Sequence, residues 1–140
     1  MSILGVSAFH HDSAAALIKK GRIIGACHEE RFTRKKFDNN WPQQSIDYLY
    51  NKANGIKTVA FYDKDNKGDS KNLIKKQFPQ AEVVYVDHHE SHAMSSILTT
   101  TWKECAVMVV DTVGGDYSTS RGVFSNNQFK WLKRIKYPNS

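Results

Sequence analysis

Short apolar runs separated by polar turns make up much of the chain, and each run has the length typical of a β-strand. Near the N-terminus, the runs over residues 3–8, 14–18 and 23–28 predict three strands. Gly21 lies in the turn before the third run, where glycine adopts a positive φ without steric cost. The pattern therefore predicts a meander of three strands at the start of the chain.

Helical periodicity appears first in the middle of the chain. Between Pro42 and Gly55, apolar residues recur on one face from Ile46 to Ala53, which predicts a helix over residues 45–54. The segments that follow are a strand at 58–62, a polar loop at 63–70, a short amphipathic helix at 71–78 and a strand at 82–86. Strands and helices therefore alternate in the middle of the chain.

The last third of the chain predicts one more helix and a second meander. Residues 93–98 suit a helix, and residues 105–110 form the most hydrophobic run, which predicts a buried strand closed by Asp111. Strands over 118–125 and 128–137 are joined by a turn at Asn126-Asn127. Together these elements predict a mixed α/β domain, in which polar residues at strand ends gather at one edge of the sheet.

Three histidines lie within five residues directly after the strand predicted over 82–86. His88 and His92 are four residues apart, so on a helix their imidazoles share one face and can bind one metal ion. Alternatively, one caps the helix and the other is an ordinary polar side chain. His89 points away from the shared face, which predicts a supporting or structural role. Asp87 can cap the helix by accepting a backbone N–H bond.

Asp111 and the glycines after it form a second polar cluster. With two histidines, a carboxylate completes the ligand set of non-haem iron and catalytic zinc sites. Gly114 and Gly115 let the backbone approach a phosphate or a nucleotide closely. Alternatively, Asp111 is only a cap or a turn residue.

The third cluster follows the first predicted strand. His11 can act as a general base on a hydroxyl group, with Asp12 beside it, although both residue types are also common in plain turns. Arg34 and Lys36 belong to a basic segment over 31–36 that can bind a phosphate or a carbonyl oxygen. The alternative for this segment is solvated charge that balances Glu29 and Glu30.

Composition and charge narrow the class of protein. The 140 residues fit one soluble domain, and no run of about 18 apolar residues predicts a membrane span. The net charge of +6 is scattered, without a nucleic-acid-binding motif, so it favours solvated surface or a pocket for a small anion. The start of the chain lacks the pattern of a signal peptide, and Cys27 and Cys105 suit buried reduced thiols. We therefore expect a cytoplasmic protein.

Several segments, in order, resemble the N-terminal part of the NodU/CmcH carbamoyltransferases, which modify nodulation factors and antibiotics. The similar segments are residues 3–16, residues 29–36 (EERFTRKK), residues 86–93 (VDHHESHA), residues 109–111 and residues 137–140. The resemblance implies an α/β, actin-like ATPase or ribonuclease-H-like fold, with a mixed sheet and flanking helices. It also implies that residues 1–140 form a single N-terminal lobe of the metal and acceptor domain.

The resemblance implies a reaction as well. Carbamoyl phosphate and ATP give carbamoyl-adenylate in a C-terminal domain, and the N-terminal domain transfers the carbamoyl group to a substrate hydroxyl at a divalent metal, iron. By motif, His88, His92 and Asp111 match the metal ligands, His11 the catalytic histidine, and Lys36 a residue near the carbamoyl group. The expected substrate contacts are Asp12, Arg34, Lys36, Gly114 and Gly115.

Two departures from the family pattern qualify these expectations. Thr112 stands where the family has glycine, and the chain stops at Ser140, before a further metal carboxylate and the adenylate-forming domain. We therefore expect an inactive lobe whose uncovered edges favour self-association. The alternative function is a non-catalytic nucleotide- or metal-binding actin-like module that assembles with a partner. An actin-like kinase fragment would use Asp12 for magnesium and need no histidine pair.

Overall fold

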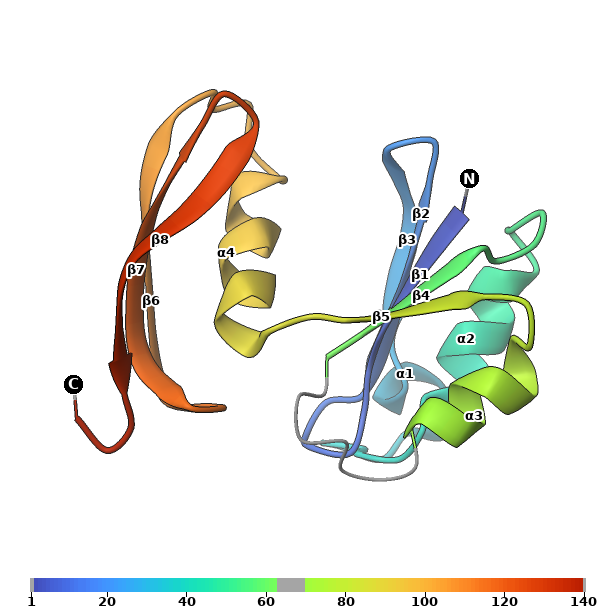
Figure 1. The fold of residues 1–140 in the computed structure, drawn as a ribbon. Coiled ribbons are helices and arrows are strands. Elements are labelled where there is room, and N and C mark those ends of the chain that lie inside the picture. Colours follow the sequence, from blue (N-terminus) through green and yellow to red (C-terminus); the bar gives the residue numbers. More distant parts are fainter. Residues whose placement is uncertain (1, 63–69, 140) are drawn as a thin grey trace. The chain divides into compact units, whose positions relative to one another are not determined.

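A computed structural model describes residues 2–62 and 70–139 of the chain (Figure 1). The chain divides into two compact units, Met1–Val86 and Asp87–Ser140, and each is described by itself. Most of the loop predicted over 63–70 lies outside the described residues, because only Ser70 is described and it begins a helix. The predicted order of strands and helices is confirmed along the rest of the chain, except that the short helix over Glu30–Thr33 was not predicted.

The first unit is built on a five-stranded mixed sheet of order β3-β2-β1-β4-β5. Its strands are β1 (Ser2–Ser7), β2 (Ala14–Lys19), β3 (Arg22–His28), β4 (Thr58–Phe61) and β5 (Glu82–Tyr85). The strands β1, β2 and β3 form the predicted antiparallel meander, whereas β4 and β5 join β1 in parallel. The carboxyl ends of β1, β4 and β5 therefore meet at one edge of the sheet.

The core of this unit follows the two-residue period of its strands. Leu17, Leu4 and Val59 pair across β2, β1 and β4, and all are fully buried. The helices are α1 (Glu30–Thr33), α2 (Gln43–Tyr50) and α3 (Ser70–Gln77). Figure 1 shows α2 and α3 on the same side of the sheet, and their buried apolar residues belong to this hydrophobic core: Ile46, Leu49 and Ile74. Each large apolar side chain buried in this way contributes about 1.5–3 kcal/mol.

Helix α2 begins after Pro42, as predicted, but a distant carboxylate completes its first turn. The Glu29 side chain is buried and accepts backbone N–H bonds from Gln44 at 3.0 Å and Ser45 at 2.8 Å. These N–H groups have no partner within the helix, and a negative charge suits the positive end of the helix dipole. Glu29 is therefore a buried part of the α2 N-terminus, which the alternative of solvated charges balanced by Glu29 and Glu30 did not foresee.

The second unit packs the helix α4 (His88–Ile97) on a three-stranded antiparallel sheet of order β6-β7-β8. The strands are β6 (Cys105–Gly114), β7 (Tyr117–Ser125) and β8 (Gln128–Lys136). Ala93 and Ile97 of α4 pack with Val109 and Phe124 of the sheet. The predicted turn at Asn126-Asn127 is confirmed, and both residues have the positive φ that a tight hairpin of this kind needs.

Strand β6 differs from the prediction in its length and its burial. It continues three residues past Asp111 to Gly114, so Asp111 lies within the strand and does not close it. Only one face of the strand is covered: Val109 is buried, whereas Met108 and Val110 are 69% and 67% exposed. The prediction of a fully buried strand was wrong because apolar residues occupy both faces of β6. In the sequence, such a strand cannot be distinguished from one that is covered on both faces.

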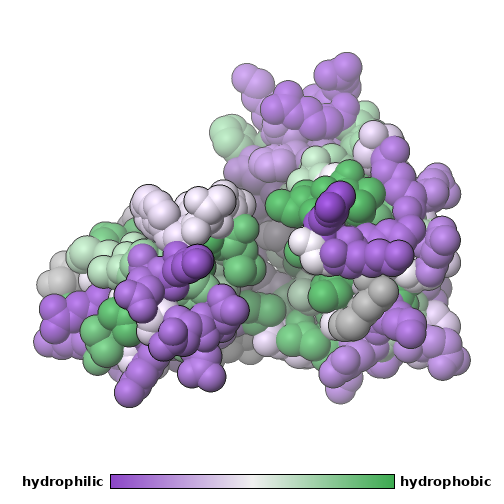
Figure 2. Space-filling view, turned by 90° about the horizontal axis from the view of Figure 1, so that it is seen from above, coloured by the Kyte–Doolittle hydropathy of each residue, from purple (hydrophilic) through white to green (hydrophobic). Residues whose placement is uncertain are grey.

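Apolar residues remain at the surface of both units, where Figure 2 shows hydrophobic patches among the hydrophilic ones. Large examples are Ile23 of β3, Met108 of β6 and Leu132 of β8. Cys27 and Cys105 are free and only half-buried. Among the described residues, no helix has the length and apolar composition that crossing a membrane requires.

The buried carboxylate of Glu29 gives the first prediction. Glu29→Gln removes the charge from a group that accepts two backbone N–H bonds, so we expect a loss of about 1–3 kcal/mol in the free energy of unfolding. Urea denaturation followed by far-ultraviolet circular dichroism measures this loss. The control is Glu82→Gln, at an exposed position of β5. Equal unfolding midpoints for the two variants would show that the cap has no energetic role.

Candidate functional site

The candidate site of the second unit begins where α4 begins. Asp87 has an extended backbone, with φ −64° and ψ 144°, and its side chain accepts the Glu90 N–H at 3.1 Å. This confirms the predicted cap, which starts the helix at His88. One turn later His92 lies beside His88, with ring centroids 4.6 Å apart. The spacing of four residues therefore brings both imidazoles to one face of the helix.

Asp111 of β6 meets this pair of imidazoles. Its Oδ2 atom lies 2.5 Å from His88 Nε2 and 3.6 Å from His92 Nε2. The two Nε2 atoms are 3.1 Å apart. The structure thus brings together the three residues that the sequence nominates as metal ligands, although they lie on different elements, and we call them the His-His-Asp triad.

The donor atoms of the triad suit a transition metal. Ligand atoms about 2.1 Å from one ion lie about 3.0–3.4 Å apart at octahedral or tetrahedral angles. Two of the three separations, 3.1 and 3.6 Å, are near this range, while the 2.5 Å separation is a direct hydrogen bond between His88 and Asp111. Two imidazoles and one carboxylate form a donor set found in iron and zinc enzymes.

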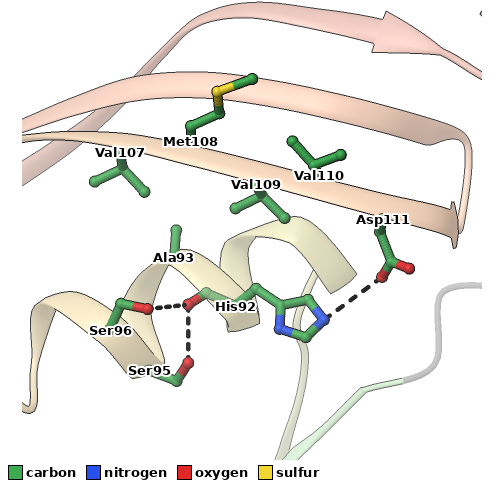
Figure 3. A pocket seen from close by; sticks show the side chains of 9 residues that line it. All are labelled: His92, Ala93, Ser95, Ser96, Val107, Met108, Val109, Val110 and Asp111. Atoms are coloured by element: carbon green, nitrogen blue, oxygen red, sulfur yellow. Dashed lines mark hydrogen bonds and ion pairs between the residues drawn. The ribbon is translucent and has the colours of Figure 1, made fainter. Parts of the chain in front are cut away.

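The triad is open to solvent on one side. The exposed fraction of the side chain rises from 20% for His88 to 30% for Asp111 and 55% for His92. A shallow cavity of about 380 Å³ adjoins His92 and Asp111, between α4 and the apolar residues 107–110 of β6 (Figure 3). A ligand or a further donor atom can therefore reach the triad without displacing protein.

Asp111 is held as a carboxylate. The hydrogen bond from His88 is the main cause that lowers its pKa from the ordinary value of 3.8, and the positive charges that His88 and His92 carry when protonated act in the same direction. The carboxylate is consequently the stable form of Asp111 at all but strongly acidic pH, which is the form that binds a cation.

His89 does not share the face of its neighbours, as predicted. It is fully buried, and its Nδ1 atom lies 2.7 Å from Ser120 Oγ of β7. Burial is the main cause that lowers its pKa, which favours the neutral imidazole. Neither Ser120 nor its neighbour Arg134 of β8 was predicted from the sequence, in which Arg134 is one of several scattered basic residues.

In the first unit, the structure pairs His11 with Asp12. His11 Nδ1 lies 2.8 Å from Asp12 Oδ2, and the His11 side chain is 82% exposed. A carboxylate on Nδ1 fixes the orientation of the ring and leaves Nε2 to accept a proton. Asp12 was expected to contact a substrate, and in this structure its carboxylate contacts His11.

The loop that carries this pair has an unusual backbone. Phe9 and Asp12 have φ values of 71° and 53°, a region in which bulky side chains are strained. Two backbone hydrogen bonds hold the loop: Phe9 N–H donates to Asn39 O at 2.9 Å, and Ser13 N–H donates to Asp38 O at 2.8 Å. The segment that follows Lys36 therefore lies against the His11 loop.

The remaining nominated residues lie on other segments of the chain. Arg34 ends α1 with φ 60°, and Lys36 is exposed two residues later. Gly114 ends β6, where it pairs with Tyr117, and Gly115 has φ 69° in the turn between β6 and β7. His11, Asp12, Arg34 and Lys36 thus belong to the first unit, whereas the triad and the two glycines belong to the second.

Comparisons with known proteins identify relatives. The family model described as Carbamoyltransferase N-terminus matches residues 2–72. An uncharacterized protein of Synechocystis is 31% identical, over 99% of this chain and 30% of its own length. The nodulation protein NolNO of Sinorhizobium fredii is 27% identical, over 81% of this chain and 21% of its own length. The chain thus spans between about a fifth and a third of these relatives.

A solved structure shows the fold class. YeaZ from Pseudomonas aeruginosa matches with a TM-score of 0.56 and 12% identity, over 100% of this chain and 71% of that chain. At this identity the likeness shows the fold alone. With the mixed sheet and its flanking helices, it confirms the predicted actin-like ATPase or ribonuclease-H-like class.

The lowered pKa of Asp111 gives the second prediction. The contribution of this carboxylate to stability is present above its ordinary, unfolded-state pKa of 3.8 and is lost as the pH falls through the lower pKa of the folded state. In the presence of a chelator, Asp111→Asn should lower the free energy of unfolding by about 1–2 kcal/mol at pH 6. The difference should shrink steadily below pH 4.

Urea denaturation of both proteins at a series of pH values measures this difference. The control is Glu104→Gln, an exposed position of the same unit, which should follow the wild type throughout. A difference between wild type and Asp111→Asn that is constant down to pH 2 would contradict the assignment, because it would then not depend on the charge of the carboxylate.

Proposed function

Because the chain belongs to the family of carbamoyltransferase N-terminal domains, we propose that it is part of an O-carbamoyltransferase that moves a carbamoyl group to a substrate hydroxyl. The donor we propose is carbamoyl-adenylate, made from carbamoyl phosphate and ATP by a C-terminal part of the enzyme. Residues 1–140 would then be the N-terminal lobe, which supplies metal ligands and a base and lacks activity alone. The geometry of the His-His-Asp triad is the observation that carries this proposal.

The triad would hold the metal. His88, His92 and Asp111 offer ligand atoms that all lie within 4.8 Å of one another. We propose iron, because two histidines and one carboxylate form the donor set of non-haem iron sites. When bound, a divalent ion supplies positive charge that polarises the acyl donor and balances its phosphate. The open side of the triad leaves room for these ligands, and for a further carboxylate from outside residues 1–140.

His11 would be the general base. Its Nε2 atom, which has no hydrogen-bond partner among the described residues, would accept the proton of the acceptor hydroxyl, while Asp12 on Nδ1 orients the ring and stabilises the imidazolium that forms. The acceptor oxygen then bonds to the carbamoyl carbon, and the bond from that carbon to the adenylate breaks, which releases AMP. The exposure of His11 agrees with a base that must meet a substrate from solution.

The basic and glycine-rich positions would bind the anionic part of the donor. Arg34 and Lys36 place positive charge on the segment that precedes the Asn39 contact with the His11 loop. Gly114 and Gly115 allow a phosphate to approach the turn after β6. Thr112, where the family pattern has glycine, is exposed and carries a branched side chain that would narrow such an approach.

Metal titration gives the third prediction. Chelator-treated chain should bind Fe²⁺ under anaerobic conditions, or Mn²⁺ as a stable probe, with one ion per chain by calorimetry. His92→Ala removes a ligand from an exposed position and should weaken binding by more than about 100-fold without unfolding the protein. His28→Ala is the matched control, because His28 is an exposed histidine of the first unit.

Two results would count against the proposal. If the wild-type chain binds no divalent ion, the family relationship stands and the alternative of a non-catalytic nucleotide-binding module is favoured. If the ion binds but His92→Ala and His28→Ala bind it equally well, the metal has another site. Binding should also weaken as the pH falls, because imidazoles must lose their protons to act as ligands.

A further inference from the structure

Three consecutive residues at the start of α4 are each tied to a different strand of the sheet. The Asp87 Oδ1 atom accepts a hydrogen bond from the Arg134 guanidinium of β8 at 2.7 Å. His88 Nε2 lies 2.5 Å from Asp111 Oδ2 of β6, and His89 Nδ1 lies 2.7 Å from Ser120 Oγ of β7. The first turn of the helix is therefore held at three points.

These ties fix the rotation of the helix about its axis. Successive residues of an α-helix point about 100° apart. With His89 buried against β7, His88 and then His92 must point toward the strand that carries Asp111. A rotation of one residue position would carry His88 away from Asp111 and break the cap at Asp87 in the same movement.

Arg134 connects two of the three ties. Its Nη2 atom donates to Asp87, and its Nε atom donates to Ser120 Oγ at 3.3 Å, the same oxygen that contacts His89. Its guanidinium lies 3.7 Å from the centre of the Tyr117 ring and 5.2 Å from that of Trp131. A planar cation with donors on two edges and aromatic rings against it has little freedom to move.

Two irregularities in the sheet place Arg134 on the helix side. Trp131 and Lys133 of β8 pair with the adjacent residues Gly122 and Arg121, so Leu132 is an extra residue in the strand. By strict alternation Trp131 and Arg134 would point to opposite faces, and the extra residue returns them to one face. A second shift, between Tyr117 and Thr119, does the same for Tyr117 and Ser120.

Packing alone does not account for His89. Its Nε2 atom is fully buried and has no hydrogen-bond partner among the described residues. An unpartnered buried nitrogen is destabilising, and an apolar side chain of similar size would avoid it. The hydrogen bond at Nδ1 to Ser120 is the property that an apolar residue cannot reproduce.

We propose that Arg134 and Ser120 are positioning residues, which hold the first turn of α4 through Asp87 and His89 so that His88 and His92 face Asp111. This inference rests on the proposed function, because the triad is the site that the positioning serves. Neither residue touches the expected ion. Their effect is indirect, through the rotation and the start of the helix.

The test uses two variants and a control in the full 140-residue chain. Arg134→Met keeps the aliphatic stem against the aromatic rings but removes both hydrogen bonds. Asp87→Asn keeps a good helix cap but removes the charge that Arg134 pairs with. Lys133→Met is the control: the neighbouring side chain is exposed and lies with Met108 and Thr119, apart from the helix contacts.

The measurements are Mn²⁺ affinity and the visible spectrum of bound Co²⁺, which reports the geometry of the ligands. Arg134→Met and Asp87→Asn should weaken Mn²⁺ binding by about 10–100-fold and change the Co²⁺ spectrum, whereas Lys133→Met should do neither. A merely structural role would lower the urea midpoint without changing the affinity or the spectrum of the folded protein. That result would overturn the inference.

A measurement without metal separates this inference from the proposed function. In the chelator-treated chain, nuclear magnetic resonance of the histidine ring nitrogens reports the hydrogen bond between His88 and Asp111. Arg134→Met should shift the His88 signals toward those of a free imidazole, and Lys133→Met should leave them unchanged. If no ion binds but the shift occurs, the metal function fails and the positioning stands. If His88 is unchanged in Arg134→Met, the positioning fails.

Discussion

The hydrogen bond between His88 and Asp111 connects a helix to a strand, and the arrangement of the second unit depends on it. The bond forms only if the helical period of α4 and the two-residue period of β6 bring the two side chains together. Along β6, the two-residue period places Asp111 on the same face as Val109, which is buried against α4. Along α4, the period of 3.6 residues places His88 and His92 on one face and Ala93 and Ile97 in the core. The packing that buries the apolar residues therefore also brings the carboxylate to the imidazoles.

Much of this arrangement is readable from the sequence because it follows from local rules. The two strand meanders, the Asn126-Asn127 turn and the Asp87 cap each depend on residues close together in the chain. The pairing of His88 with His92 likewise follows from their spacing in the sequence. Their partner Asp111 was found because polar residues next to apolar strands are informative even when the end of the strand is misplaced, as it was here by four residues. The fold class was implied by the resemblance to a family, which depends on several motifs in the same order along the chain.

The features that were missed depend on contacts between residues far apart in the sequence. Glu29 reaches helix α2 some 15 residues later, and nothing in its charged neighbourhood distinguishes it from Glu30. Arg134 faces the helix only because Leu132 is an extra residue in β8, so strict alternation would assign it to the opposite face. The burial of His89 depends in turn on Ser120, 31 residues away. Register, which sets these contacts, is not visible in hydrophobic periodicity.

The two units hold the side chains of their candidate sites by different physical means. In the first, backbone hydrogen bonds from Phe9 and Ser13 to the segment after Lys36 hold a loop with strained φ values, so the position of His11 depends on main-chain geometry. In the second, side chains from three strands hold one turn of a regular helix. A strained backbone and a side-chain network are disrupted by different kinds of substitution. The loop should be most sensitive to substitutions that change the preferred φ of a residue. The helix should instead be most sensitive to the loss of single polar atoms.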